Sequence, residues 1–67
     1  MAKYRKRPVE VEAVQLTRVT YIHTLEGTMR GNVGDWLVTG TAGEQYPVRG
    51  DIFHEVYERV EEEVNRA

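Results

Sequence analysis

The fold of this chain is decided by one stretch of its sequence, Gly34-Asp35-Trp36-Leu37-Val38-Thr39-Gly40-Thr41-Ala42-Gly43-Glu44-Gln45-Tyr46-Pro47-Val48-Arg49. It holds two short runs of strand-forming residues, 36–38 and 45–48, each bordered by glycine or polar residues. Gly43 lies where a three-residue hairpin loop needs a left-handed backbone, so we predict a β-hairpin. Pro47 cannot donate a hydrogen bond to a neighbouring strand, which predicts that the second strand lies at a sheet edge or beside a bulge. We expect this edge to contact a second copy or a partner.

The residues before the hairpin predict further antiparallel strands. Valine and alanine alternate with glutamate over residues 9–13, which is typical of a half-buried strand. A second strand is expected over residues 21–25 and a short third strand over residues 28–30, with Glu26 and Gly27 as the turn between them. With the central hairpin, this makes four or five strands between residues 9 and 49.

The end of the chain predicts one helix, over residues 51–63. Asp51 is a suitable N-cap, because its carboxylate can accept hydrogen bonds from the free amides of the first turn. We expect the helix to fray after Arg59, since valines and an acidic C-terminal end disfavour it. Apolar residues recur every three or four positions and predict a stripe that covers the sheet, made of Ile52, Phe53, Val56, Tyr57, Val60 and Val64. The fold class is therefore α+β, a small twisted antiparallel sheet with one C-terminal helix packed on it.

The length and composition limit the architecture further. The chain has 67 residues, a net charge of -2 and no cysteine. We therefore expect a single domain over residues 1–67, with a core so small that the chain is a homo-oligomer. No apolar run reaches the length of a membrane span, and the basic start is not followed by an apolar segment. We expect a cytoplasmic protein that does not contact membranes.

The charges are unevenly distributed along the chain. Residues 1–7 form a basic tail that contains Lys3, Arg5, Lys6 and Arg7. Acidic residues are concentrated in the last seventeen positions. One interpretation is a solvated tail and a solvated helix face. The other is an arm that contacts phosphates and binds nucleic acid weakly, because clustered cations supply the sequence-independent part of that affinity.

The residue types predict binding rather than catalysis. His23 and His54 have no spacing typical of a metal site, so we expect exposed or hydrogen-bonded histidines, and we expect no cofactor or metal. Serine and cysteine are absent, which removes the two commonest nucleophiles. The glycines are spaced as turns and form no phosphate-binding loop, and we expect the Asp35 side chain, after Gly34, to stabilise a turn. We therefore predict that the protein is not an enzyme.

The large aromatic residues have two interpretations. Most simply, Trp36 and Tyr46 of the hairpin pack against the aromatic residues of the helix in the core. Alternatively, Trp36 and Tyr46 form a shallow ligand site together with Arg30 and Arg49, in which a nucleobase stacks and a phosphate pairs with arginine. The second interpretation predicts a protein that sequesters a small ligand or nucleotide.

A resemblance covers nearly the whole chain. The start, from Lys3-Tyr4-Arg5-Lys6 to Val14-Gln15, is similar to that of a family of small uncharacterised phage and prophage proteins. The same family is resembled by Thr24-Leu25-Glu26-Gly27, Gly34-Asp35-Trp36-Leu37-Val38, Gly43-Glu44-x-Tyr46-Pro47 and Asp51-Ile52-Phe53-x-x-x-Tyr57-Glu58. Members commonly carry a longer, often helical stretch where this chain has Arg18-Val19-Thr20, and the loss of that helix favours assembly. The resemblance implies a phage-encoded accessory protein, and we expect it to act by binding a host protein.

Overall fold

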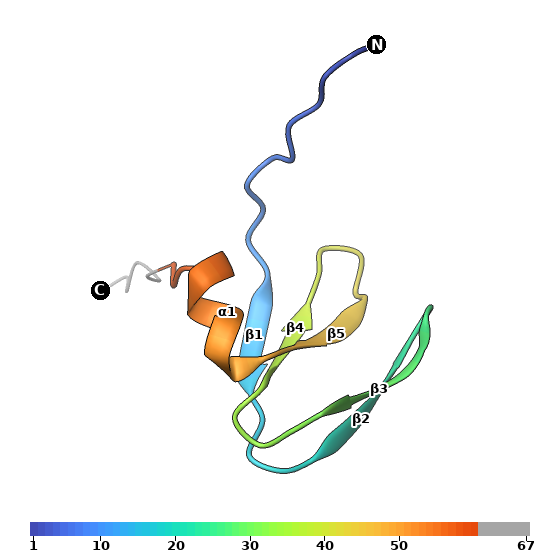
Figure 1. Cartoon of the computed structure of the whole chain (residues 1–67), viewed down its shortest axis with the longest axis vertical. Coiled ribbons are helices and arrows are strands. Elements are labelled where there is room, and N and C mark those ends of the chain that lie inside the picture. The colour runs from blue at the N-terminus through green and yellow to red at the C-terminus, as the bar shows by residue number, and fades with distance from the viewer. Residues whose placement is uncertain (61–67) are drawn as a thin grey trace, which may run out of the picture.

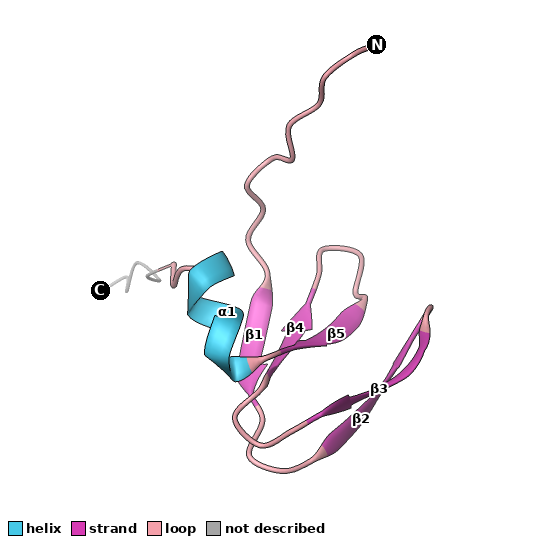
Figure 2. Ribbon diagram, viewed as in Figure 1, coloured by secondary structure: helices cyan, strands magenta, loops and turns pink. Residues whose placement is uncertain are grey.

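Two antiparallel sheets and one helix make up the computed structural model, which describes residues 1–60. The elements in chain order are β1 (Glu12–Gln15), β2 (Thr20–Thr24), β3 (Gly27–Gly31), β4 (Trp36–Thr39), β5 (Gln45–Val48) and α1 (Gly50–Val56). One sheet has the order β1-β4-β5, and the other is the hairpin of β2 and β3 (Figure 1, Figure 2). The predicted α+β class is confirmed.

The central hairpin of β4 and β5 forms as predicted. Gly43 has a φ of 83°, and its N–H donates to the carbonyl of Gly40 to close the loop. Pro47 lies opposite Leu37. The Gly40 N–H donates to the Glu44 carbonyl, so the even-numbered residues of β4 and β5 exchange the hydrogen bonds of the ladder. Pro47 is odd-numbered, and its backbone nitrogen points away from β4, so no ladder bond is lost. The sheet order places β5 at an edge, which confirms the inference drawn from Pro47.

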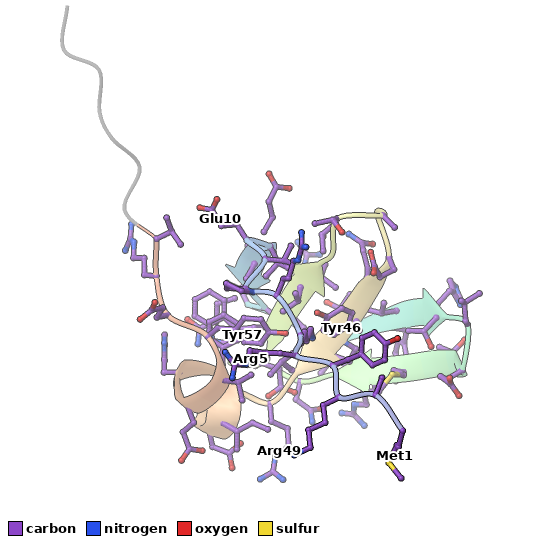
Figure 3. All side chains as sticks on the ribbon, turned by 90° about the horizontal axis from the view of Figure 1, so that it is seen from above. Met1, Arg5, Glu10, Tyr46, Arg49 and Tyr57 are labelled. Carbon is purple, nitrogen blue, oxygen red and sulfur yellow. The ribbon has the colours of Figure 1, made fainter. Side chains whose placement is uncertain are left out.

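The strands do not form the one continuous sheet that we expected. The hairpin of β2 and β3 is a separate sheet that packs beside β5. Its turn begins one residue earlier than predicted, because Thr24 caps it: the Thr24 hydroxyl donates to the Gly27 carbonyl and accepts from the Glu26 N–H. Seen from above, the hairpin and α1 lie on opposite sides of the three-stranded sheet (Figure 3).

The core is divided between these two sides. In the described part, the buried apolar side chains are Leu16, Ile22, Val38 and Phe53. Leu16 and Ile22 converge on Gly31, where a Cβ would lie 2.5 Å from the Leu16 Cδ1 atom. Glycine at that position is therefore what lets the hairpin approach the sheet. Phe53 packs on the other side, beneath α1.

The helix is much shorter than the predicted span of residues 51–63. It ends at Val56, and Tyr57 has an extended backbone with φ -119° and ψ 141°. Tyr57 leaves the helix toward β5, where its hydroxyl bonds to that of Tyr46. Val56 is 68% exposed, so no burial favours a further turn of poor helix formers. Positions 61–63 of the predicted span lie outside the described residues.

The expected apolar stripe is therefore reduced to two residues. Phe53 is buried and Tyr57 is half-buried, whereas Ile52, Val56 and Val60 are exposed. The reason is geometric: a helix of seven residues presents one narrow face to the sheet, and Ile52 and Val56 lie off that face. Val64 lies outside the described residues.

The first strand is also shorter than expected. It begins at Glu12 rather than Val9, because β4 ends at Thr39, the partner of Glu12, and supplies no residue to pair with earlier positions. Val9 is 54% exposed, so the burial that the alternation of valine and glutamate predicted at this position was wrong. Residues 1–10 are exposed and have no regular secondary structure.

A polar junction fixes the start of α1. The N-cap is Arg49 rather than the predicted Asp51, which lies in the first turn and pairs with Arg49. The Gly50 N–H instead donates to the Asp35 Oδ1 atom, and the Asn32 N–H donates to Asp35 Oδ2. These two bonds lower the pKa of Asp35 below its usual 3.8. Asp35 therefore stabilises its own turn, as predicted, and also joins that turn to the helix.

No helix among residues 1–60 is long and apolar enough to cross a membrane.

Replacing Gly50 with alanine should destabilise the domain by about 1–3 kcal/mol, because the new Cβ would overlap the Gly34 carbonyl oxygen, which belongs to the backbone. Gly40→Ala is the matched control, since its Cβ would meet the Glu44 carboxylate, which can move away. Urea unfolding measures both variants. Equal stability of the two would show that the junction is not tightly packed.

The Asp35 carboxylate should make folding sensitive to acid. Because the pKa of Asp35 is lower in the folded than in the unfolded chain, the carboxylate stabilises the fold at pH values above its unfolded-state pKa. This stability is lost as the pH falls through the folded-state pKa. Between about pH 5 and about pH 2, the urea midpoint of the natural protein should therefore fall more than that of Asp35→Asn. Asp51→Asn is the control, because Asp51 is exposed and bonds only to a side chain on the surface. Parallel curves for Asp35→Asn and the natural protein would contradict this role.

Candidate functional site

The aromatic side chains form one continuous cluster between the sheet and α1. Trp36 stacks on Phe53 with ring centroids 4.2 Å apart and planes inclined by 6°. Phe53 stacks in turn on Tyr57 at 5.0 Å, and the His54 ring meets the edge of both Trp36 and Phe53. The Tyr57 hydroxyl lies 3.1 Å from that of Tyr46 (Figure 3). The cluster therefore joins β4, the helix and β5.

The structure brings together only part of the predicted ligand site. Trp36 and Tyr46 share the helix-facing side of the sheet, because Tyr46 pairs with Val38 and side chains alternate along a strand. One face of Trp36 is occupied by Phe53, where a nucleobase would stack. Arg49 is exposed and paired with Asp51. Arg30 lies in the other sheet, opposite Tyr21. The nucleotide site stays a prediction that this arrangement does not favour.

Two polar groups of the cluster, the Tyr46 hydroxyl and the Trp36 indole N–H, differ in their surroundings. The hydrogen bond with Tyr57 raises the pKa of Tyr46 to about 12, because the neutral phenol keeps that bond. The indole N–H of Trp36 is buried and has no hydrogen-bond partner among the described residues. Such a group is costly to bury, so the stacking of Trp36 must compensate for it.

The predicted nucleic-acid residues lie on an exposed arm. Lys3, Arg5, Lys6 and Arg7 are exposed, and the arm extends away from β1 (Figure 1). The strands β1, β4 and β5 contain no basic residue, and β1 contains Glu12. The three-stranded sheet therefore does not extend the positive charge of the arm. Nucleic-acid binding by this arm stays a prediction.

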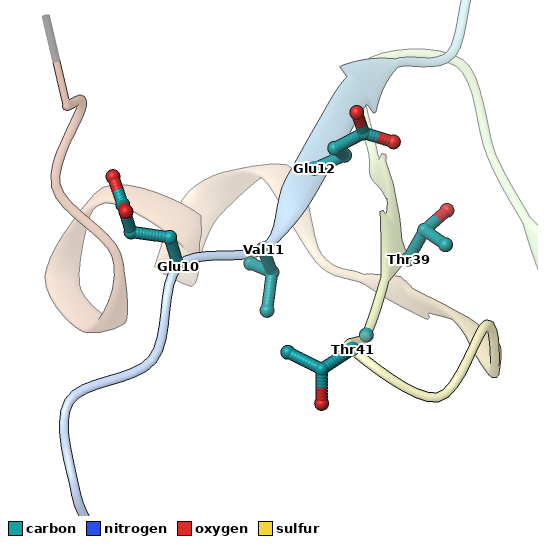
Figure 4. A pocket seen from close by; sticks show the side chains of 6 residues that line it. Glu10, Val11, Glu12, Thr39 and Thr41 are labelled. Carbon is teal, nitrogen blue, oxygen red and sulfur yellow. The ribbon is translucent and has the colours of Figure 1, made fainter.

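A hollow of about 360 Å³ lies where the arm enters the sheet. It is lined by Glu10, Val11 and Glu12 on one side and by residues 39–41 on the other (Figure 4). Among residues 1–60, no three acidic or histidine side chains are close enough to hold a metal ion. His23 instead bonds to the Thr28 hydroxyl at 2.9 Å. The hollow is therefore an acidic surface beside the base of a basic arm.

Sequence reasoning missed two exposed features. The hairpin of β2 and β3 displays Tyr21 and Leu25, which are 63% and 106% exposed. All four residues of β1 are exposed as well, at the opposite edge of the sheet from β5. The full exposure of Leu25 follows from its place in a two-residue turn, which a more accurate turn boundary would have identified.

Compared with protein-family models, curated proteins and solved structures, the chain matches none of them.

The bond between the two tyrosines should be visible in a spectrophotometric titration. Tyr46 should ionise near pH 12, and Tyr57→Phe should move its pKa down toward the usual value of 10.0 because the partner hydroxyl is gone. The raised pKa also means that the stability from this bond is present at neutral pH and is lost as the pH rises through the folded value. Tyr21→Phe is the control, because Tyr21 is exposed and far from the cluster in sequence. An unchanged titration in Tyr57→Phe would contradict the bond.

Proposed function

We infer that this chain is a small non-enzymatic binding protein and that its partner is another protein. The projecting hairpin of β2 and β3 is the surface that supports this function best. The resemblance to phage and prophage proteins makes the partner a protein of the bacterial host, met in the host cytoplasm.

The hairpin has the side chains that dominate protein interfaces. Tyr21 and Arg30 lie opposite each other on the two strands, and Leu25 is at the tip. Tyrosine and arginine are enriched among the residues that carry most of the binding energy. Burial of the exposed leucine at the tip against a partner would remove its apolar surface from water, which is favourable. The single observation that carries the proposal is that Leu25 is fully exposed at the tip of the hairpin.

Asp35 and Tyr46 have shifted pKa values, and both groups are used in structural contacts. Both shifts are caused first by hydrogen bonds that hold the fold together, to Asn32 and Tyr57 respectively. A catalytic group is usually tuned while it stays available to a substrate. Asp35 and Tyr46 are instead occupied in structural contacts.

Affinity capture from host lysate tests the hairpin. A bait that carries Tyr21→Ser and Leu25→Ser should retain its partner at least about tenfold less well than the natural chain, since both anchors are removed. Val33→Ser is the matched control, because Val33 is 64% exposed and lies outside the hairpin. The proposal requires a protein held by the natural and control baits and released by the hairpin variant. Equal recovery on all three baits would overturn it.

A further inference from the structure

The outer edge of β1 is open for pairing. β1 pairs with β4, and no strand of the described part lies on its other side. The Leu16 N–H donates to the Asp35 carbonyl, so the even-numbered residues of β1 direct their backbone groups toward β4. The backbone groups of Ala13 and Gln15 therefore point outward. At the other edge of this sheet, where we expected contact with a second copy or a partner, Pro47 removes the outward-pointing donor in the middle of β5, so that edge is less suited to pairing than the edge of β1.

The arm that precedes β1 is suited to fill such an edge. It continues from β1 as an extended chain in which residues 1–10 are all exposed (Figure 1). Its charges reverse along its length, from cations at residues 3–7 to Glu10 and Glu12. A segment of this kind is complementary to itself in the antiparallel direction, because the basic half of one copy meets the acidic half of the other.

We propose that two copies of the chain exchange their arms, so that residues 3–15 of each form an antiparallel ladder around a two-fold axis at Val9. Outward-pointing residues must face one another in such a ladder, so odd-numbered positions pair with odd-numbered ones. In this register Lys6 of each copy is opposite the partner's Glu12. Tyr4 is likewise opposite the partner's Val14.

Charge selects this register over those that shift the axis toward β1. An axis at Glu10 places the Glu10 carboxylates of the two copies opposite each other. An axis at Val11 places Glu10 opposite the partner's Glu12. An axis at Glu12 places the two Glu12 carboxylates opposite each other. Like charges directly opposite each other destabilise a sheet. An axis at Pro8 also avoids like charges, but it places Tyr4 opposite the partner's Glu12 rather than an apolar residue.

The remaining features of the arm fit the same ladder. Pro8 is even-numbered and falls at a position whose N–H is not needed for the ladder, so it costs no hydrogen bond. Because the sheet has one open edge, the exchange closes into a dimer and does not extend into a fibre. The hairpin of β2 and β3 lies beside β5, at the other edge, and stays free.

Charge reversal tests the pairing by light scattering after size-exclusion chromatography. The natural chain should elute as a dimer, and removal of residues 1–7 should leave a folded monomer, because those residues are exposed. Lys6→Glu and Glu12→Lys should each weaken dimerisation about tenfold or more, since two equivalent pairs become repulsive. The double variant should restore it. A monomeric natural chain, or a double variant no tighter than the single ones, would overturn the exchange.

A cysteine at the axis tests the register directly. The chain has no cysteine of its own. Val9→Cys should form a disulfide-linked dimer under mild oxidation, because facing Cα atoms are about 5.5 Å apart. Position 5 is also exposed, but Arg5→Cys should not cross-link, since its two copies are about 26 Å apart along the ladder. Cross-linking of Pro8→Cys in place of Val9→Cys, or rescue of Lys6→Glu by Glu10→Lys, would overturn the Val9 register. The hairpin variant Tyr21→Ser with Leu25→Ser should dimerise normally, which separates this test from that of the proposed function.

Discussion

The stack of Trp36 on Phe53 is the contact on which the rest of the structure depends. The helix that carries Phe53 has seven residues, which is too short to be stable alone in water. It forms because Phe53 is buried against Trp36 and because Asp35 accepts a hydrogen bond from its first N–H. The residue that precedes Trp36 thus fixes the start of the helix, while Trp36 itself holds the helix against the sheet.

The core is small and leaves many apolar residues on the surface of the protein. Four apolar side chains are buried in the described part, and they are split between the two sides of a three-stranded sheet. A domain with so little buried area is marginally stable on its own. Apolar residues that a larger protein would bury are exposed here on the arm, the hairpin and the outer face of α1. Association would bury them and would complete the fold as well as bind a partner.

The two edges of the three-stranded sheet differ in how readily they can pair with another strand. Pro47 removes a hydrogen-bond donor from the middle of β5 and so protects that edge from pairing. Ala13 and Gln15 keep their donors at the edge of β1, and Glu10 and Glu12 supply charges that discriminate between incoming strands. Natural sheets commonly block edges in this way, and a sheet with one blocked edge has a limited assembly.

The amino-acid sequence by itself determined the α+β class, the hairpin around Gly43, the edge position of Pro47 and the turn role of Asp35. These features depend on local rules: glycine permits a positive φ, proline lacks a donor, and an aspartate carboxylate bonds to nearby amides. What only the tertiary structure decided was the separation of the strands into two sheets and the early end of the helix at Val56. The helix ends where Tyr57 takes an extended backbone and its hydroxyl bonds to that of Tyr46 on β5. A contact of this kind, between side chains on different elements, leaves no periodic signal in a sequence.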